Sequence, residues 1–274
     1  MPARILARLA VALAATALIV VSLLKLEAAS DGVRLERRQV GSIPVTVFDA
    51  QPAAGAAARP VVVIAHGFAG SQQLMLPFAL TLARHGYLVL TFDFPGHGRN
   101  RVPMAGGMVD FAASTRALLA ALDEVAQAAR TWPGGDGRLL LLGHSMASDI
   151  VIRRAMADPA VQATIALSAY SPLVTASAPR NLLIVDGAWE PSMLHAEGLR
   201  IVGLALGGAG SVDEARTYGD FAAGTARRFV LADGVEHISI LYSHEALREA
   251  LAWFDRSVAP PAAPDARRFV DARG

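Results

Sequence analysis

Three continuous apolar runs limit what this chain can fold into more than any other feature of its sequence. The runs PVVVIA (residues 60–65), YLVLTF (87–92) and LLLLG (139–143) show no alternation of polar and apolar positions. Strands of this kind are buried on both faces, as they are in a parallel sheet covered by helices. Segments with helical spacing separate the runs. The sequence therefore predicts an α/β fold, with a mostly parallel central sheet covered by helices on both faces.

The remaining elements follow from the same patterns of hydrophobicity. Alternating or short apolar segments predict further strands, the first two half-exposed near an edge of the sheet, over residues 33–40, 43–50, 163–170, 181–187 and 227–234. Helical spacing predicts helices over residues 71–86, 108–130, 146–156 and from 243 onward. The second of these helices is expected to bury Phe111, Leu118, Leu122 and Val125 on one face.

The N-terminus carries a membrane signal that precedes this fold. Arg4 and Arg8 come before an uncharged apolar stretch from Leu9 to Leu24, and Lys25 follows it. The stretch approaches the length of a spanning helix if its flanking basic side chains snorkel. We favour an uncleaved anchor that holds the rest of the chain outside the cytoplasm. A cleaved signal peptide, which would give a secreted protein, is the alternative, although LKLEAAS lacks the expected small residue at its third-last position.

Composition and these signals divide the chain into three parts. We expect an N-terminal hydrophobic helix over residues 1–29, one α/β domain over 30–258 and a disordered tail rich in proline and alanine over 259–274. The chain has no cysteine, which excludes disulfides and thiolate metal sites. A net charge of +1 without a basic stripe argues against nucleic acid as a partner.

A serine stands where the third apolar run stops. The motif Gly143-His144-Ser145-Met146-Ala147 lies between a predicted buried strand and a predicted helix. Ser145 could simply cap that helix. It could also be a nucleophile held on a sharp strand-to-helix turn, as in the G-x-S-x-G elbow, with Ala147 in place of the second glycine. Partners elsewhere in the chain decide between the two interpretations.

From Val33 to Val258 the chain resembles the α/β-hydrolase family, in the manner of serine esterases and lipases without a cap domain. HGF (residues 66–68) ends an earlier strand as the family's oxyanion loop does, and DFPGHGRN (93–100) is similar to its glycine turn. The resemblance implies a catalytic triad in the chain order serine, acid, histidine.

Residues that match this order are present. The segment Gly187-Ala188-Trp189-Glu190-Pro191 resembles the family's acid segment and selects Glu190, with Asp186 as the alternative acid. Asp186 is otherwise expected to be a solvated carboxylate at the end of a strand. His237 lies in the loop after the last predicted strand, where the resemblance places the histidine.

The resemblance implies a serine hydrolase that acts on a small-molecule or lipid-like carboxylic ester. Ser145 would attack, His237 would carry the proton, Glu190 would orient the imidazole, and the backbone N–H groups of Phe68 and Met146 would form the oxyanion hole. This chemistry requires no metal or cofactor. The same triad also permits a thioesterase, a peptidase or an acyltransferase, and a non-catalytic α/β-hydrolase-like binding module is the alternative from a different class.

The segments after the two central strands bear on the substrate. Only residues 171–180 separate the strands at 163–170 and 181–187, which is too few for a helical cap, so we expect an open cleft. Residues 191–225 are expected to form a loop, or a flap over the site.

Overall fold

The computed structural model describes residues 2–50, 57–107, 109–207 and 211–258, and these confirm the predicted α/β architecture. A nine-stranded sheet runs through the domain in the order β1-β2-β4-β3-β5-β6-β7-β9-β8. Its strands are β1 (Arg34–Val40), β2 (Ile43–Asp49), β3 (Arg59–Ala65), β4 (Leu88–Phe92), β5 (Gly135–His144), β6 (Val161–Leu167), β7 (Leu182–Gly187), β8 (Thr217–Tyr218) and β9 (Arg227–Ala232). The helices are α1 (Pro2–Ala28), α2 (Leu76–Arg84), α3 (Phe111–Arg130), α4 (Met146–Ala157), α5 (Ser192–Gly203) and α6 (His244–Val258), with short 3₁₀ turns η1 (Gln72–Met75), η2 (Leu204–Leu206) and η3 (Ser239–Tyr242).

The six adjacent strands β4, β3, β5, β6, β7 and β9 are parallel to one another. The antiparallel pairs are β1 with β2, β2 with β4, and β8 with β9, near the two outer sides of the sheet. Because parallel strands point the same way, the carboxyl ends of β4, β5, β7 and β9 all lie at the same end of the sheet. The loops that follow these strands therefore meet there, which is where ligand sites form in sheets of this kind.

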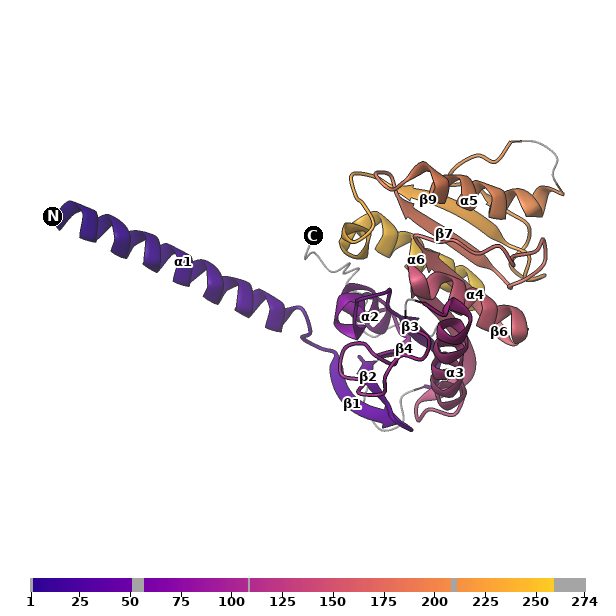
Figure 1. Cartoon of the computed structure of the whole chain (residues 1–274), viewed down its shortest axis with the longest axis horizontal. Helices are drawn as coiled ribbons and strands as arrows, with labels where there is room; N and C mark the ends of the chain where they lie inside the picture. The colour runs from indigo at the N-terminus through magenta and orange to yellow at the C-terminus, as the bar shows by residue number, and fades with distance from the viewer. Residues whose placement is uncertain (1, 51–56, 108, 208–210, 259–274) are drawn as a thin grey trace.

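Helices cover both faces of the sheet (Figure 1). Alternate residues of a strand face opposite sides: Val62 and Ile64 of β3 join one core cluster with α2 and α6, whereas Val61 and Val63 join another with α3 and α4. Every residue of β3 and β4 is buried. The uninterrupted apolar runs are thus explained by burial on both faces.

Strand β2 departs from the sequence expectation because it is almost entirely buried. It lies between β1 and β4, and is not itself at the edge. Only β1 has the exposure of an edge strand, with its charged residues open to solvent. Polar and apolar residues alternate similarly in β1 and β2. The two strands differ in burial because β2 has a neighbouring strand on each side and β1 has only one.

Helix α3 begins at Phe111 and not at 108 as the spacing predicts; residue 108 lies outside the described residues. Asp110 is its N-cap, and the Asp110 carboxylate accepts a hydrogen bond from the N–H of Ala113. Leu118, Leu122 and Val125 are buried as expected, but the Phe111 side chain is exposed. The first turn of the helix extends beyond the sheet, so the periodic pattern overestimates the buried face by one turn.

Residues 192–203 form helix α5 and not the loop or flap expected for this region. Ile201 and Val202 of α5 are buried in a cluster with Phe229 of β9. Gly198 lies against the Phe229 ring so closely that a Cβ at this position would overlap it. This part of the segment expected to be a loop or flap is therefore a helix packed on the sheet, and residues 208–210 of the same segment lie outside the described residues.

Helix α1 projects from the domain as a rod (Figure 1), with no part of its Ala3–Lys25 stretch buried. That stretch has 23 residues and a mean hydropathy of 2.3. At about 1.5 Å per residue it is long enough for a hydrocarbon layer of about 30 Å. It is compatible with an anchor or with a signal sequence. The predicted boundaries at 29/30 and 258/259 remain predictions, and the tail 259–274 lies outside the described residues.

Candidate active site

Ser145 lies on a sharp turn between β5 and α4, with a backbone φ of 54° and ψ of −119°. A positive φ is rare for residues other than glycine and marks a strained position. The turn is held by hydrogen bonds from the N–H of Ser145 to Leu167 O (2.9 Å) and from the N–H of Ser148 to Ser145 O (2.8 Å). The Ser145 side chain makes no capping hydrogen bond to α4. The simple explanation of Ser145 as a helix cap is therefore wrong.

The turn is tight because two backbone segments nearly touch. A Cβ on Gly143 would overlap the backbone carbonyl of Ala147, so the position before the turn has room only for glycine. Ala147, which stands in place of the motif's second glycine, is fully buried and packs in the cluster that contains α3 and α4. Its extra methyl group is accommodated by the core.

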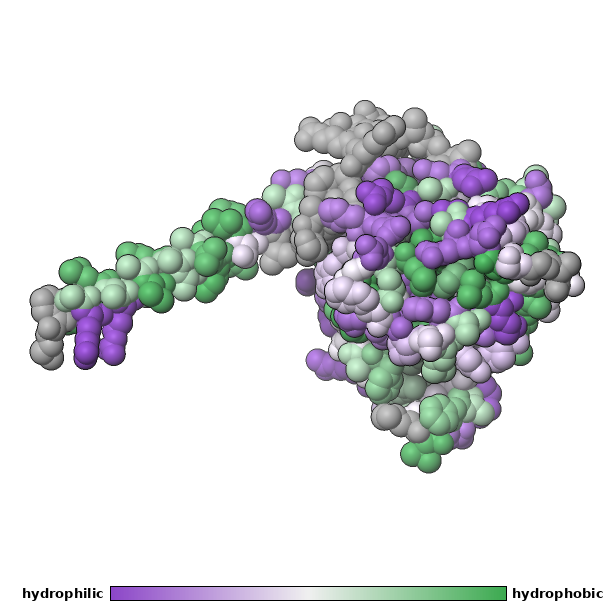
Figure 2. Space-filling view, turned by 90° about the horizontal axis from the view of Figure 1, so that it is seen from above, coloured by the Kyte–Doolittle hydropathy of each residue, from purple (hydrophilic) through white to green (hydrophobic). Residues whose placement is uncertain are grey.

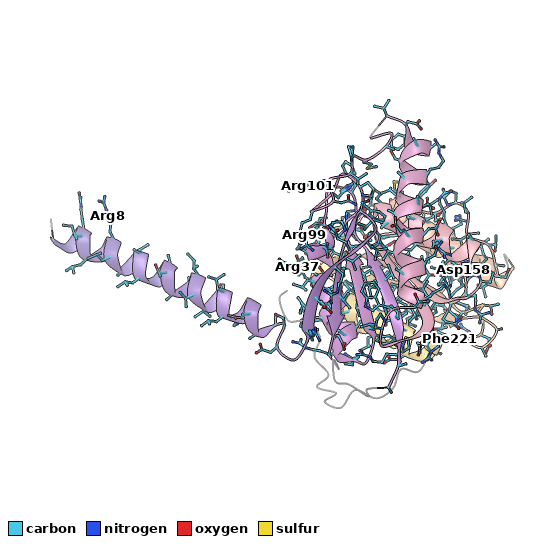
Figure 3. All side chains as sticks on the ribbon, turned by 90° about the horizontal axis from the view of Figure 1, so that it is seen from below. Arg8, Arg37, Arg99, Arg101, Asp158 and Phe221 are labelled. Carbon is cyan, nitrogen blue, oxygen red and sulfur yellow. The ribbon has the colours of Figure 1, made fainter. Side chains whose placement is uncertain are left out.

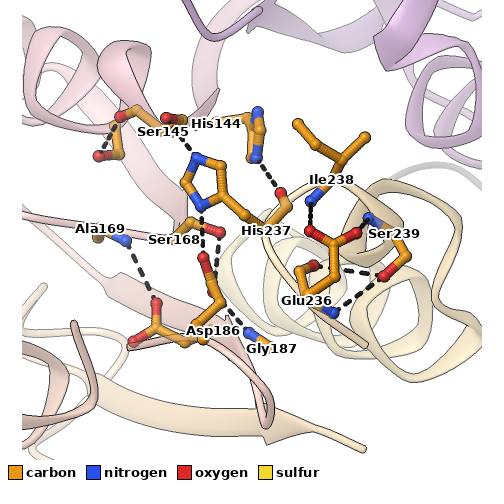
Figure 4. Close-up of polar contacts among 12 residues, drawn as sticks. His144, Ser145, Ser168, Ala169, Asp186, Gly187, Glu236, His237, Ile238 and Ser239 are labelled. Atoms are coloured by element: carbon orange, nitrogen blue, oxygen red, sulfur yellow. Dashed lines mark hydrogen bonds and ion pairs between the residues drawn. The ribbon is translucent and has the colours of Figure 1, made fainter. Parts of the chain in front are cut away.

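His237 faces Ser145 from the loop after β9, although 92 residues separate them in sequence (Figure 4). Its Nε2 lies 2.7 Å from Ser145 Oγ, and its Nδ1 lies 2.5 Å from Glu190 Oε1. The hydrogen bond to Glu190 raises the pKa of His237, against the opposing effect of burial. The His237 side chain is partly exposed, whereas the Glu190 carboxylate is buried.

Glu190 follows β7 on a tight turn in which its own N–H donates to Gly187 O (3.0 Å). Its Oε2 accepts hydrogen bonds from the N–H of Gly187 (2.7 Å) and from Ser168 Oγ (3.0 Å). Burial acts to raise the pKa of Glu190, but the hydrogen bonds from His237, Gly187 and Ser168 together lower it below its ordinary value. The carboxylate is therefore held ionised and in a fixed orientation toward the imidazole.

Asp186, the alternative acid, is not hydrogen-bonded to His237. It is fully buried at the end of β7, which corrects the expectation of a solvated carboxylate. Its Oδ1 accepts a hydrogen bond from the N–H of Ala169 (3.2 Å), while Oδ2 has no partner among the described residues. Burial, followed by the charge of Glu190, raises the pKa of Asp186 to about 7. The pKa is thus raised at Asp186 and lowered at Glu190, although the two residues are only four positions apart.

The two predicted oxyanion donors lie near Ser145. Gly67 passes so close that a Cβ on it would lie 3.1 Å from Ser145 Cβ, and Phe68 is the next residue. Met146 is the first residue of α4, where backbone N–H groups carry partial positive charge. Within the described part of the chain, the N–H groups of Phe68 and Met146 have no hydrogen-bond acceptor. Both are available to a ligand.

Two buried histidines hold the segments around Ser145, and the sequence did not reveal this. His144 Nε2 lies 2.8 Å from the carbonyl oxygen of His237 and fixes the backbone of that loop. His66 donates from Nδ1 to Gly67 O (2.8 Å), and its Nε2 accepts from the N–H of Phe94 (3.2 Å). Burial lowers the pKa of both histidines to about 4, so both are neutral near pH 7.

Glu236 was also missed. Its carboxylate accepts hydrogen bonds from the N–H groups of Ile238 (3.0 Å) and Ser239 (2.8 Å), which closes the loop around His237 (Figure 4). Ser168, which bonds Glu190, was likewise not identified. No motif contains Ser168 or Glu236, although Glu236 adjoins His237. His66 and His144 lie inside the motifs HGF and Gly143-His144-Ser145, but neither motif indicates which backbone groups these side chains bind. Among the described residues, no group of three His, Asp or Glu side chains could hold a metal ion.

Comparisons with known proteins identify a family model and solved structures to which this chain is similar. A family model described as serine aminopeptidase, S33, matches residues 56–191. The solved structure of TT1662 from Thermus thermophilus has a TM-score of 0.59 at 18% identity, covering 81% of this chain and 97% of that one. A predicted CIB-like hydrolase from Thermoplasma acidophilum has a TM-score of 0.59 at 16% identity, with coverages of 81% and 97%.

A bacterial membrane phospholipase A has a TM-score of 0.57 at 15% identity, covering 92% of this chain and 98% of that one. At these identities the likeness is one of fold. No curated protein matches the sequence significantly.

The raised pKa of Asp186 makes a prediction about stability. Its folded-state pKa of about 7 exceeds its ordinary value of 3.8, so the fold favours the protonated form and loses stability as the pH rises between these values. Asp186→Asn removes this titration. The melting temperature of the variant relative to the unsubstituted chain should therefore increase between about pH 5 and about pH 8. Asp233→Asn, at an exposed aspartate, is the control; an Asp186→Asn difference that stays constant with pH would contradict the assignment.

Proposed function

The chain belongs to the α/β-hydrolase superfamily, and on this premise we propose that it is a serine hydrolase that cleaves carboxylic esters through an acyl-enzyme. The observation that carries the proposal is the unbroken series of two hydrogen bonds from Ser145 Oγ through His237 to Glu190. A positive φ at Ser145 adds support, because a strained backbone persists where the surrounding structure enforces it.

Each residue of the proposed triad has one task. His237 Nε2 takes the proton of Ser145 Oγ as Oγ bonds to the carbonyl carbon of the ester. When the tetrahedral adduct collapses, the imidazolium returns that proton to the departing alcohol, and the acyl group stays on Oγ. Water then loses a proton to His237 and attacks the acyl carbon, and Oγ is reprotonated as the carboxylic acid leaves. Glu190 remains ionised throughout and stabilises the imidazolium.

The negative oxygen of each tetrahedral adduct needs donors that are already in position. The free N–H groups of Phe68 and Met146 support this role, because both adjoin Ser145 and neither is engaged elsewhere in the described chain. Loss of one such donor costs about 10²–10³ in rate in enzymes of this chemistry. His66, through Gly67, and His144, through His237, act as positioning residues in this scheme.

We propose a lipid-like ester as the substrate class. Phe68, Trp189 and Ile238 are each adjacent to a site residue and carry exposed apolar side chains. The short connection between β6 and β7 adds no helical cap above them. Exposed apolar side chains beside the site residues suit an acyl chain, and the structural similarity to a membrane phospholipase A supports this substrate class.

A peptidase is the second candidate, since the matching family model is described as a serine aminopeptidase. The same triad would attack an amide through the same steps, with an amine as the leaving group. A thioesterase, an acyltransferase or a non-catalytic binding module has less support. Binding alone does not require a serine with a strained backbone that is hydrogen-bonded to a histidine, which argues against a non-catalytic module.

We further propose that α1 stays uncleaved and anchors the domain to a membrane on its extracytoplasmic side. The exposed apolar length of α1 and the basic residues Arg4 and Arg8 at its start support this topology. A secreted form released by cleavage remains the alternative.

The nucleophile is tested by Ser145→Ala. A fluorophosphonate probe should label the full chain in detergent on Ser145, and the variant should show no labelling. Its turnover of p-nitrophenyl butyrate should fall by about 10⁴–10⁶-fold, because without Oγ no acyl-enzyme forms. Ser42→Ala, at an exposed serine between β1 and β2, is the control, and there labelling should persist. Undiminished turnover by Ser145→Ala would eliminate the proposed nucleophile.

The acid is tested by comparing Glu190→Gln with Asp186→Asn. Glu190→Gln should lower turnover on the order of 10⁴-fold, since the imidazole loses its orienting charge. It should also move the acid limb of the pH–rate profile to lower pH, because the hydrogen bond that raises the pKa of His237 is weakened. Asp186→Asn should lose far less activity. The reverse order would assign the role to Asp186.

The topology is tested by a reporter enzyme, active only outside the cytoplasm, fused after Gly274. Activity should appear in the membrane fraction at the mass of the uncleaved chain. Activity in the soluble exported fraction, at a mass reduced by the first 29 or so residues, would indicate a signal peptide. An inactive reporter would contradict export altogether.

A further inference from the structure

The connection between α1 and the domain is short and fixed. Helix α1 ends at Ala28 and β1 begins at Arg34. Ala29 and Val33 between them are buried in the core cluster with α2 and α6. The Arg84 guanidinium donates hydrogen bonds to the carbonyl oxygens of Ala29 (2.5 Å) and Asp31 (3.2 Å). A domain joined in this way cannot move far from the end of α1, so one of its sides must face any membrane that α1 enters.

Basic side chains occupy the side of the domain from which α1 extends. Figure 3 shows Arg37 of β1 and Arg99 and Arg101 after β4 on this side. Arg37 and Arg101 are exposed and have no acidic partner in the described part of the chain. Arg99 donates to Thr46 Oγ1 (3.1 Å) and lies 3.8 Å from the buried Asp93. Two unpaired cations and one partly paired cation therefore face outward.

Exposed apolar side chains belong to the same connection between β4 and α3. Val109 is 93% exposed, Phe111 75% and Val102 41%. Figure 2 shows a tip of hydrophobic side chains projecting at the lower edge of the domain. Asp110, the acid among them, is engaged as the N-cap of α3. Val102 directly follows Arg101 in the chain. Exposed apolar side chains together with unpaired arginines form the combination that binds the interfacial layer of a lipid bilayer.

We propose that Arg37, Arg99, Arg101, Val102, Val109 and Phe111 form a docking surface for anionic phospholipids of the bilayer that α1 enters. The arginines bind lipid phosphates, and Val109 and Phe111 enter the boundary between headgroups and acyl chains. Each arginine near an anionic surface strengthens such binding by about fivefold. The inference rests on the proposed membrane anchor and is independent of the proposed ester chemistry.

Docking has a consequence for the candidate active site. The connection that carries four of the six residues, and leads to Phe111 at the start of α3, begins at the end of β4, and Ser145 follows the end of the parallel strand β5. The connection and Ser145 therefore lie at the same end of the sheet, where the parallel strands have their carboxyl ends. The docked domain therefore holds this end close to the lipid layer, from which an apolar ester could reach Ser145 without crossing bulk water.

The test uses the absence of cysteine from the chain. Val109→Cys supplies the sole thiol, to which an environment-sensitive NBD fluorophore is attached. Ala222→Cys is the matched control: it is exposed and adjoins Phe221, which Figure 3 shows away from α1. The labelled full-length chain is reconstituted into vesicles of phosphatidylcholine alone or with phosphatidylglycerol. We expect the Val109→Cys label to gain about twofold in emission in the anionic vesicles, and the control label to stay unchanged.

Charge reversal separates lipid docking from other causes. Arg101→Glu should remove about half or more of the gain, whereas Arg256→Glu, beside Phe221, should remove little. Equal emission in both vesicle types, or equal effects of the two reversals, would overturn the proposal. A gain that rises with protein density per vesicle would also overturn it, in favour of a second copy of the chain.

The two proposals fail separately. Docking should persist in a chain that carries Ser145→Ala. Turnover of the soluble ester p-nitrophenyl butyrate in detergent should be unchanged by Arg101→Glu. Lost turnover with intact docking counts against the ester chemistry alone, and the opposite result counts against the docking surface alone.

Discussion

The strained backbone at Ser145 is the constraint on which the rest of the site depends. Its positive φ turns the chain from β5 into α4 within one residue, and the close approach of Gly143 to Ala147 leaves no room to relax it. This geometry directs Oγ away from α4 and toward His237. With a relaxed turn the Ser145 hydroxyl would cap α4 and would not face His237. No arrangement of the other side chains could then restore the Ser145–His237 hydrogen bond.

Around this turn, burial and hydrogen bonding divide the ionisable groups into two kinds. Glu190 has three hydrogen bonds and a lowered pKa, while Asp186, with one, has a raised pKa. His237 is partly exposed, bonded to a carboxylate and raised in pKa, while His144 is buried against a carbonyl oxygen and lowered. Chemically similar side chains therefore differ in pKa, because burial sets the direction of the shift at Asp186 and His144, whereas hydrogen bonds outweigh burial at Glu190 and His237.

The common direction of the strands connects the site to the rest of the molecule. The loops that carry Ser145, Glu190 and His237 and the connection that carries Arg101 and Val109 all leave the sheet at one end. The short attachment of α1 keeps this domain near the end of that helix. The candidate active site and the residues of the proposed docking surface thus lie at the same end of the sheet, although they come from different segments of the chain.

Hydrophobic periodicity by itself determined the buried parallel strands and the helices between them, because these depend on burial on both faces. The association of Ser145, Glu190 and His237 was predicted from the resemblance of the motifs and their order to the α/β-hydrolase family. Periodicity cannot say where a helix leaves the sheet, so Phe111 was assigned to the core and α5 was taken for a loop. Tertiary structure alone decided that Asp186 is buried without a histidine partner and that His144 holds the His237 loop. Those outcomes depend on contacts between segments 17 to 93 residues apart, which local sequence patterns do not encode.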